Sequence, residues 1–267
     1  METIESLQDR LRLDPISHIG RKSVHLIHAY ELGYQLGRQR WAKPLLKVEL
    51  NGHAFQNWAE HRFGWTAEMG CRQDVVSFSL LISVDEQSAF DTYFDLRDAA
   101  RRDLGMVVDT EAESHPLPAE GLITFIANEH FRSRPGLYLG SASVDALWAL
   151  CSGFVWAEKD VEVRDSDAQT FLVGFQRWME ERYPFATARP WNRILSFLTL
   201  GSPDRAWASF FEVLDMFRAG RSPKSFSKTG ERMLEGITRE ILANEPAREI
   251  TEVSATLREV VKGITPV

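Results

Sequence analysis

Cysteine and long apolar runs are both scarce in this sequence. The two cysteines, Cys71 and Cys151, are too few for a disulfide framework, and Cys151 lies in an apolar stretch where a free thiol behaves as a small hydrophobic side chain. No stretch approaches the run of about 18 apolar residues that spans a bilayer. The first residues have neither the basic nor the apolar segment of a secretion signal. We therefore expect a cytoplasmic protein without a membrane partner.

Positive charge is also in deficit. The 267 residues include 31 Lys and Arg against 38 Asp and Glu, which gives a net charge of -7. Proteins that bind DNA or RNA need clustered basic side chains to replace the counterions of the phosphates. We expect no direct binding of nucleic acid, and an acidic protein of this kind favours basic partners.

Apolar and aromatic residues, in contrast, are abundant. Apolar residues make up 44% of the chain, and there are eight Trp and 16 Phe. This composition is typical of a globular protein whose core is held together by packing. The length allows one large domain or two ordinary ones.

The sequence repeats itself at an offset of 120 residues. Eleven identities pair residues 15–65 with residues 135–185, where about three are expected from ordinary composition. They include the pattern Phe-Gln-x-Trp-x-Glu-x-Arg, which begins at Phe55 and again at Phe175. After this window the offset falls to 117. Such self-similarity indicates a tandem duplication.

We predict a mostly α-helical fold built from two copies of one unit. Copy one comprises residues 1–104 and copy two residues 121–219, with a linker over residues 105–120 that contains prolines and acidic residues. We expect about five helices in each copy and a C-terminal helical tail over residues 220–267. Minor β structure is compatible with the pattern at residues 45–50 and 161–163.

Both copies contain the same order of local patterns. Apolar residues at helical spacing are followed by a segment from a proline to a glycine, predicted to be a loop because proline stops a helix. A serine suited to an N-cap then precedes an apolar helix. These boundary residues are Pro15, Gly20 and Ser23 in copy one, and Pro135, Gly140 and Ser143 in copy two. Further on, aromatic spacing predicts that Trp58 and Trp178 lie in the core.

No motif for catalysis, metal binding or phosphate binding is complete. Five of the seven histidines lie in copy one, and His25 and His28 could share one helix face. The further ligands of a zinc site, a nucleophile elbow and a Gly-rich phosphate loop are all missing from the sequence. We therefore predict no catalytic residue, no metal and no cofactor. A hydrolase or transferase that uses the His-rich part of copy one is an alternative.

The copies differ most in the charge of the segment after their second long helix. In copy one this segment is basic, with Arg38, Arg40, Lys43 and Lys47. In copy two it is acidic, and we predict a partner-binding surface at Glu158, Asp160, Glu162, Asp165 and Asp167. Solubilising loops of accidental sign are the alternative interpretation.

Copy two contains a pattern Arg-Pro-x-hydrophobic-Tyr-hydrophobic-Gly, followed by a Gly-aromatic helix and spaced Trp. In this sequence these are Arg134 to Gly140, Gly153 to Ala157, Trp178, Trp191 and the helix from Ala206 to Phe211. With this pattern, copy two resembles the immunity proteins of bacterial polymorphic and secreted (type VI-like) toxin systems, mainly over residues 134–213. Copy one departs from the pattern, with Asp14 for Arg134 and His18 for Tyr138.

This resemblance implies a non-enzymatic protein that binds and occludes a cognate bacterial toxin, with no catalytic residues of its own. An acidic inhibitor suits a nuclease toxin, because a groove that grips phosphates is basic. A regulatory or adaptor protein with another protein partner is the alternative of a different class.

Overall fold

The computed structural model describes residues 4–41, 52–64, 75–104, 121–164, 166–183 and 189–222. Every regular element in these ranges is an α-helix, and the prediction of a mostly α fold is confirmed. The chain divides into two compact units. Unit 1 comprises Met1–Ser141 with Ala146–Ala168, and unit 2 comprises Ala142–Asp145 with Gln169–Val267. These two units differ from the two copies defined in the sequence, and the boundaries of the copies stay a prediction.

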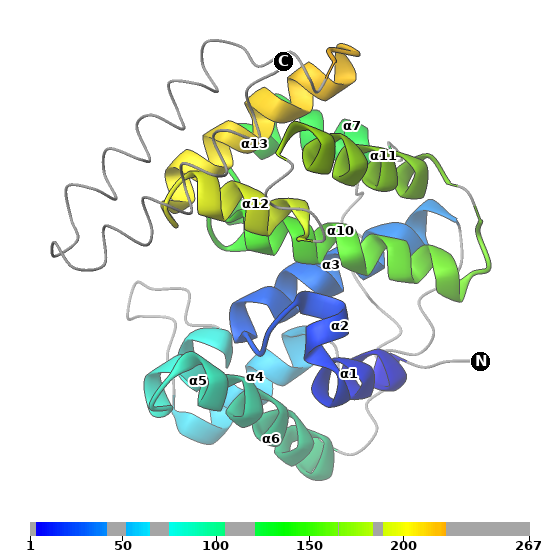
Figure 1. Cartoon of the computed structure of the whole chain (residues 1–267). Helices are drawn as coiled ribbons and strands as arrows, with labels where there is room; N and C mark the ends of the chain where they lie inside the picture. Colours follow the sequence, from blue (N-terminus) through cyan, green and yellow to red (C-terminus); the bar gives the residue numbers. More distant parts are fainter. Residues whose placement is uncertain are drawn as a thin grey trace, which may run out of the picture. The chain divides into compact units, whose positions relative to one another are not determined.

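Ten of the described helices lie wholly or mostly in unit 1. They are α1 (Ile4–Leu13), α2 (Pro15–Ile19), α3 (Val24–Arg40), α4 (Gly52–Phe63), α5 (Val75–Ile82), α6 (Glu86–Leu104), α7 (Leu122–Ala127), α8 (Glu129–Ser133), α9 (Gly136–Leu139) and α10 (Val144–Asp160). The described helices of unit 2 are α11 (Asp167–Arg182), α12 (Trp191–Leu198) and α13 (Pro203–Arg218). Figure 1 shows the helices coloured in chain order.

The two proline-to-glycine segments are short helices, and the prediction that they are loops is wrong. Pro15 occupies the first turn of α2, where its missing N–H costs nothing, and the Asp14 carboxylate caps this helix by accepting from the backbone N of Ser17 at 3.2 Å. Gly20 and Gly140 end α2 and α9 in the left-handed conformation, at φ 76° and 75°. Proline therefore starts a helix here instead of stopping one.

Ser23 lies at the N-cap of α3, as predicted, but its hydroxyl does not cap the helix. It donates instead to the carboxylate of Glu86 at the start of α6. Residues 161–163, whose pattern is compatible with a short strand, instead follow α10 in the turn that ends this helix. The other strand candidate, residues 45–50, lies outside the described residues, as do the linker and the tail from residue 223 onward.

Two long helices of unit 1, α3 and α10, approach each other at two glycines. A Cβ atom on Gly33 would lie 1.9 Å from the carbonyl oxygen of Leu150, and one on Gly153 would lie 2.0 Å from that of Tyr30. These distances are far below van der Waals contact. Glycine is required at both positions because the two backbones touch.

An aromatic cluster forms the core of unit 2. The ring of Phe175 on α11 lies 5.8 Å from Trp191, 5.8 Å from Phe210 and 5.5 Å from Phe217, measured between centroids. Trp178 is also buried, and its indole N–H donates to the carbonyl oxygen of Arg221 at 2.9 Å. Trp58 is buried to the same degree in unit 1. The prediction that both tryptophans belong to the core is confirmed.

Candidate functional site

The acidic segment at the end of α10 is the first candidate, and it holds two kinds of carboxylate. The prediction that all of it follows the helix is wrong, because Glu158 and Asp160 belong to the last turn of α10. Glu158 belongs to the interior, since its side chain is fully buried on α10. One oxygen accepts from the Ser166 hydroxyl, and the other accepts from the indole N–H of Trp41 at 3.4 Å. A partner protein cannot reach this carboxylate without opening the segment.

Asp160 is a second internal carboxylate. It is the last residue of α10, and its side chain is 10% exposed. One oxygen of its carboxylate, Oδ2, accepts both from the hydroxyl of Tyr34 on α3 at 2.7 Å and from the guanidinium of Arg10 on α1 at 3.5 Å. Burial, together with the hydrogen bond to Asp160, raises the pKa of Tyr34, so its phenol stays a donor. Asp160 thus ties α1, α3 and α10 together.

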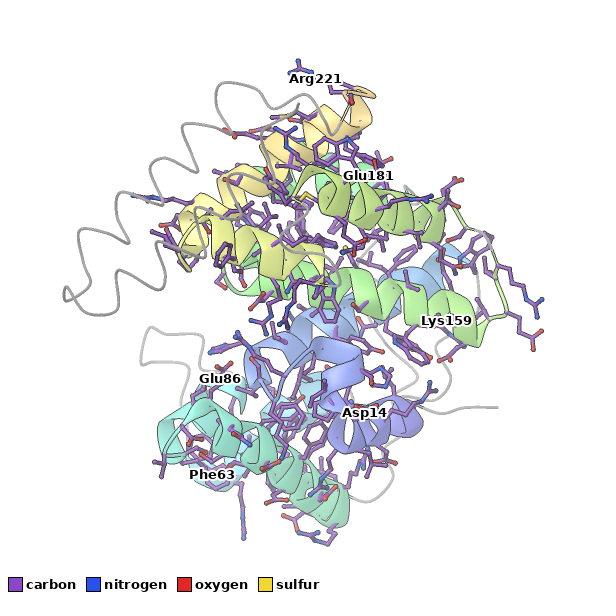
Figure 2. All side chains as sticks on the ribbon, in the orientation of Figure 1. Asp14, Phe63, Glu86, Lys159, Glu181 and Arg221 are labelled. Carbon is purple, nitrogen blue, oxygen red and sulfur yellow. The ribbon has the colours of Figure 1, made fainter. Side chains whose placement is uncertain are left out.

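The remaining predicted contact residues lie at the surface, except for Asp165, which is outside the described residues. Glu162 and Asp167 are exposed, and so are the cations Lys159 and Arg164 between them. We call residues 158–167 the α10–α11 corner. Among its described residues the exposed charges alternate in sign, a feature that the count of acidic residues in the sequence does not reveal. Lys159 is labelled at the end of α10 in Figure 2.

The backbone of the corner is held in a strained turn. Glu162 has φ 60°, the left-handed region that glycine normally occupies. Two hydrogen bonds close the turn, from the N–H of Glu162 to the oxygen of Lys159 at 3.0 Å and from that of Val163 to Glu158 at 2.9 Å. This is the pairing of a Schellman C-cap. The sequence contains no proline or glycine here to signal it.

Removal of the Asp160 carboxylate is expected to destabilise the protein. The variant Asp160→Ala leaves the Tyr34 hydroxyl and Arg10 without this acceptor, which should lower the free energy of unfolding by about 1–3 kcal/mol. Urea denaturation followed by circular dichroism measures the change. Glu162→Ala, at the exposed part of the same corner, should change stability by under about 0.5 kcal/mol. Equal losses in the two variants would contradict the assignment of Asp160 as an internal tie.

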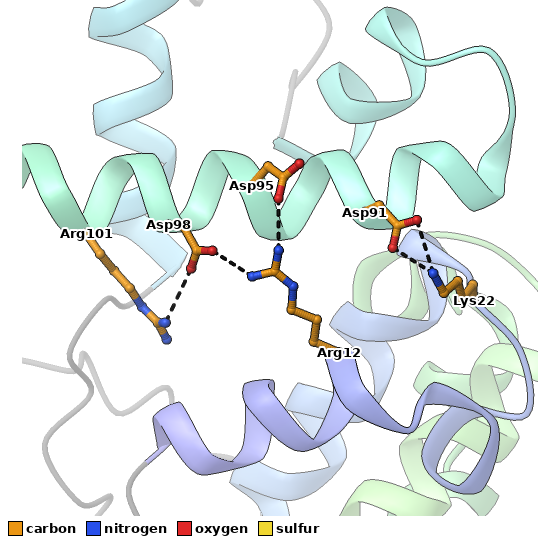
Figure 3. A network of polar contacts seen from close by, with 6 residues as sticks. All are labelled: Arg12, Lys22, Asp91, Asp95, Asp98 and Arg101. Atoms are coloured by element: carbon orange, nitrogen blue, oxygen red, sulfur yellow. Dashed lines mark hydrogen bonds and ion pairs between the residues drawn. The ribbon is translucent and has the colours of Figure 1, made fainter.

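A second polar cluster follows the exposed side of α6 (Figure 3). Arg12 donates to Asp95 at 2.9 Å and to Asp98 at 2.6 Å, and Lys22 donates to Asp91 at 2.8 Å. Each of these side chains is at least 36% exposed. Exposed ion pairs contribute little to stability and are screened by salt. The cluster pairs three of the five acidic residues of α6 with cations of the first two helices and their connection.

The histidines that motivated the metal alternative, His25 and His28, are exposed on α3. Within the described ranges, no three His, Cys, Asp or Glu side chains gather closely enough to hold a metal ion.

The basic segment of copy one also contains both buried and exposed residues. Arg38 is buried and Arg40 is exposed, and Lys43 and Lys47 lie outside the described residues.

One histidine that sequence reasoning did not single out is buried. His18 on α2 lies against Tyr30 of α3 and Trp156 of α10. The signal was present in the repeat, because His18 corresponds to Tyr138 and therefore occupies an aromatic position.

The repeated Phe-Gln-x-Trp-x-Glu pattern has a structural role in both copies. Gln56 donates to Glu60 at 2.8 Å, and Gln176 donates to Glu180 at the same distance. Gln176 also accepts from the backbone N–H of Trp191, which fixes the start of α12. In copy two the pattern therefore ties α11 to the start of α12, whereas in copy one the same bond lies within α4.

No protein-family model matches the sequence, and neither a curated protein nor a solved structure is significantly similar to it. In the part of the chain that the structure describes, no helix has both the length and the apolar character required to cross a bilayer.

Proposed function

We propose that this chain is a non-enzymatic immunity protein that binds and occludes a cognate bacterial toxin with a basic surface, such as a nuclease. The observation that carries the proposal is the α10–α11 corner, a strained and internally braced turn that presents exposed carboxylates. The resemblance of copy two to immunity proteins supports the same assignment.

Rigidity of the corner supports a binding role. A non-glycine residue in the left-handed conformation costs about 1–2 kcal/mol, and such strain gathers at functional sites. At the corner this cost is borne by Glu162, whose side chain is exposed. The buried hydrogen bonds of Glu158 and Asp160 brace the turn from inside. A surface that is ordered before binding loses less entropy when a partner binds.

Alternating charge supports selective binding. Glu162 and Asp167 suit a basic target, whereas Lys159 and Arg164 require acidic groups at defined places on that target. Such a pattern favours one partner and repels a uniformly basic surface, because like charges brought together cost several kcal/mol. Nonspecific binding to basic proteins is therefore disfavoured.

We also propose that the chain arose by tandem duplication. Both ends of α3 and α10 differ by 120 positions, the offset found in the sequence. The Gln–Glu hydrogen bonds recur at that offset. The two glycine contacts are reciprocal, since Gly33 meets Leu150, the counterpart of Tyr30, and Gly153 meets Tyr30 itself. A duplicated unit keeps what its packing requires, and the acidic corner belongs to copy two alone.

Co-expression tests the function. The product of the neighbouring gene should be toxic alone, be neutralised by this protein and be recovered with it as a one-to-one complex. The double variant Glu162→Lys with Asp167→Lys should weaken that complex at least about tenfold, because two attractions become repulsions. Measured association should also slow as salt rises.

The matched control is Glu181→Lys with Glu212→Lys, which makes the same change of charge on exposed residues of α11 and α13. This control should bind as the unchanged protein does. Equal weakening by both double variants would remove the corner from the interface. A neighbouring product that is harmless, or that this protein neither binds nor neutralises, would leave an adaptor with another protein partner as the better assignment.

Replacement of Glu162 by glycine should raise the stability of the protein and weaken its binding to the toxin. Glu162→Gly relieves left-handed strain of about 1–2 kcal/mol and adds about 0.5–1 kcal/mol of backbone entropy to the unfolded chain. The variant should therefore be about 0.5–1 kcal/mol more stable in urea denaturation, yet bind the toxin more weakly. Leu200, with φ 54°, allows a matched change. Leu200→Gly should gain similar stability without loss of binding, and weaker binding there would contradict the proposal.

A further inference from the structure

Four helices of unit 1 meet at the side chain of His18. The imidazole is 4% exposed, and its Nδ1 lies 2.9 Å from the hydroxyl oxygen of Tyr30 on α3. Its ring centroid lies 4.6 Å from that of Trp156 on α10. Arg10 of α1 reaches the same indole, with its guanidinium carbon 5.6 Å from the ring centroid. One imidazole therefore joins α2 to both long helices.

The surroundings of His18 contain two cations and two carboxylates. Besides Arg10, Lys159 of α10 places its ammonium 4.6 Å from the centroid of Trp156. Asp14 at the start of α2 and Asp160 at the end of α10 are the acidic groups, and Asp160 is already bonded to Tyr34 and Arg10. Burial lowers the pKa of His18, Arg10 and Lys159 lower it further, and the two carboxylates oppose this shift. The phenol of Tyr30 stays protonated because burial raises its pKa.

We propose that His18 is an acid-sensitive clamp, which holds residues 4–19, here called the arm, against α3 and α10 while neutral and releases them when protonated. The reaction is the uptake of one proton from solvent by the free ring nitrogen. Both ring nitrogens then carry hydrogen, so any contact with Tyr30 requires its oxygen to accept. The new positive charge lies in a buried place beside Arg10 and Lys159. Of the two nearby carboxylates, Asp14 is exposed and Asp160 is already bonded to Tyr34 and Arg10.

The direction of the pKa shift of His18 determines the pH range in which the arm is released. Because the pKa of His18 is lower in the folded state, the unfolded or opened state binds the proton more strongly. The stability contributed by the neutral clamp is complete above the ordinary value of 6.5 and is lost as pH falls through the lower folded-state pKa. Release of the arm as pH falls from 6.5 through this lower pKa is therefore assigned to the histidine.

The clamp also reaches the α10–α11 corner. Arg10 lies on the arm and donates to Asp160, which ends α10 and braces the corner. Release of the arm withdraws this donor, so toxin binding should weaken at acidic pH. This last step rests on the proposed function, whereas release of the arm does not.

Hydrogen exchange of the full chain tests the release. Amides of the arm should exchange faster at pH 5.5 than at pH 7.5 after correction for intrinsic rates, whereas amides of α11 to α13 should not. His18→Gln, which keeps a polar side chain but cannot take up the proton, should abolish the pH dependence. His25→Gln, at an exposed position on α3, should leave it intact. The opening constant changes about tenfold for each unit by which the two pKa values differ.

Three results would overturn the clamp: equal exchange of the arm at both pH values, the same pH dependence in His18→Gln, or a histidine NMR titration that places the pKa of His18 at 6.5 or above. If His18→Gln does not fold, that titration on the unchanged protein still decides the matter. Toxin affinity at the two pH values is a separate measurement. Acid-induced release of the arm with unchanged affinity would refute only the link to the corner.

Discussion

Replacing Gly33 or Gly153 with alanine is expected to lower the free energy of unfolding by about 3 kcal/mol or more, the upper end of the costs measured for overpacked interiors. The added Cβ would lie 1.9 Å from a backbone oxygen of α10 in the first case and 2.0 Å from one of α3 in the second. Backbone atoms cannot rotate away as a side chain can. The helices must separate, and unit 1 loses the close contact between α3 and α10. Thermal and urea denaturation measure the loss.

Two further glycines serve as graded controls. Gly37→Ala brings a Cβ to 2.7 Å from that of Ala157 and 2.8 Å from the oxygen of Phe154, so a smaller loss is expected. Gly174 lies inside α11, and a Cβ atom added there would meet only the end of the Phe217 ring, at 3.4 Å. Because alanine favours a helix by about 1 kcal/mol over glycine, this variant should be neutral or more stable. If Gly33→Ala and Gly174→Ala unfold alike, the close approach of α3 and α10 is wrong.

The variant Trp178→Ala should lower the free energy of unfolding by about 3–5 kcal/mol, the range for removal of an aromatic side chain from a core. The indole is 7% exposed, packs 6.1 Å from Phe217 and lies under the guanidinium of Arg182 at 5.2 Å. Its N–H also satisfies the carbonyl of Arg221 after α13. Truncation opens a cavity and removes the donor from the carbonyl oxygen of Arg221.

Phe197→Ala is the comparison for this variant, because Phe197 is 52% exposed on α12 and a surface truncation changes stability by about 0.5 kcal/mol. Both variants are compared by urea denaturation. A loss below about 1 kcal/mol for Trp178→Ala would place its indole at the surface. The repeated aromatic pattern would then be a candidate for ligand contact instead of core.

Local patterns were sufficient for the long helices and for the aromatic core. The expected number of about five helices in each copy was too low, because the described residues contain six (α1–α6) in copy one and seven (α7–α13) in copy two. The helices predicted near Ser23 and Ser143 begin at Val24 and Val144, because a polar boundary residue followed by an apolar run is a local signal. Burial of Trp58 and Trp178 followed from their helical spacing with other aromatic residues. Local reasoning failed at the prolines, where the same residue that stops one helix starts the next. At residues 161–163 no strand forms, because three β-compatible residues cannot outweigh the end of a long helix.

The sequence shows that the segment at the end of α10 is acidic. It does not show which of these carboxylates are buried and bonded and which are exposed. Three similar carboxylates occur at every second position, at Glu158, Asp160 and Glu162. The first two are bonded internally, whereas the third is exposed. Their partners Trp41, Tyr34 and Arg10 are more than 100 residues away in the chain. Burial and hydrogen bonding depend on which distant side chains arrive, and a local pattern contains no such information.

By itself the sequence determined the helical class, the internal repeat and the aromatic core, because each depends on periodicity that neighbouring residues already display. Only the tertiary structure decided why Gly33 and Gly153 recur, why His18 is buried, and which acids face solvent. Each of these is set by the distance between α3 and α10 or between α10 and the arm. Such distances arise from the packing of segments remote in sequence, where a difference of 1 Å separates a clash from a contact.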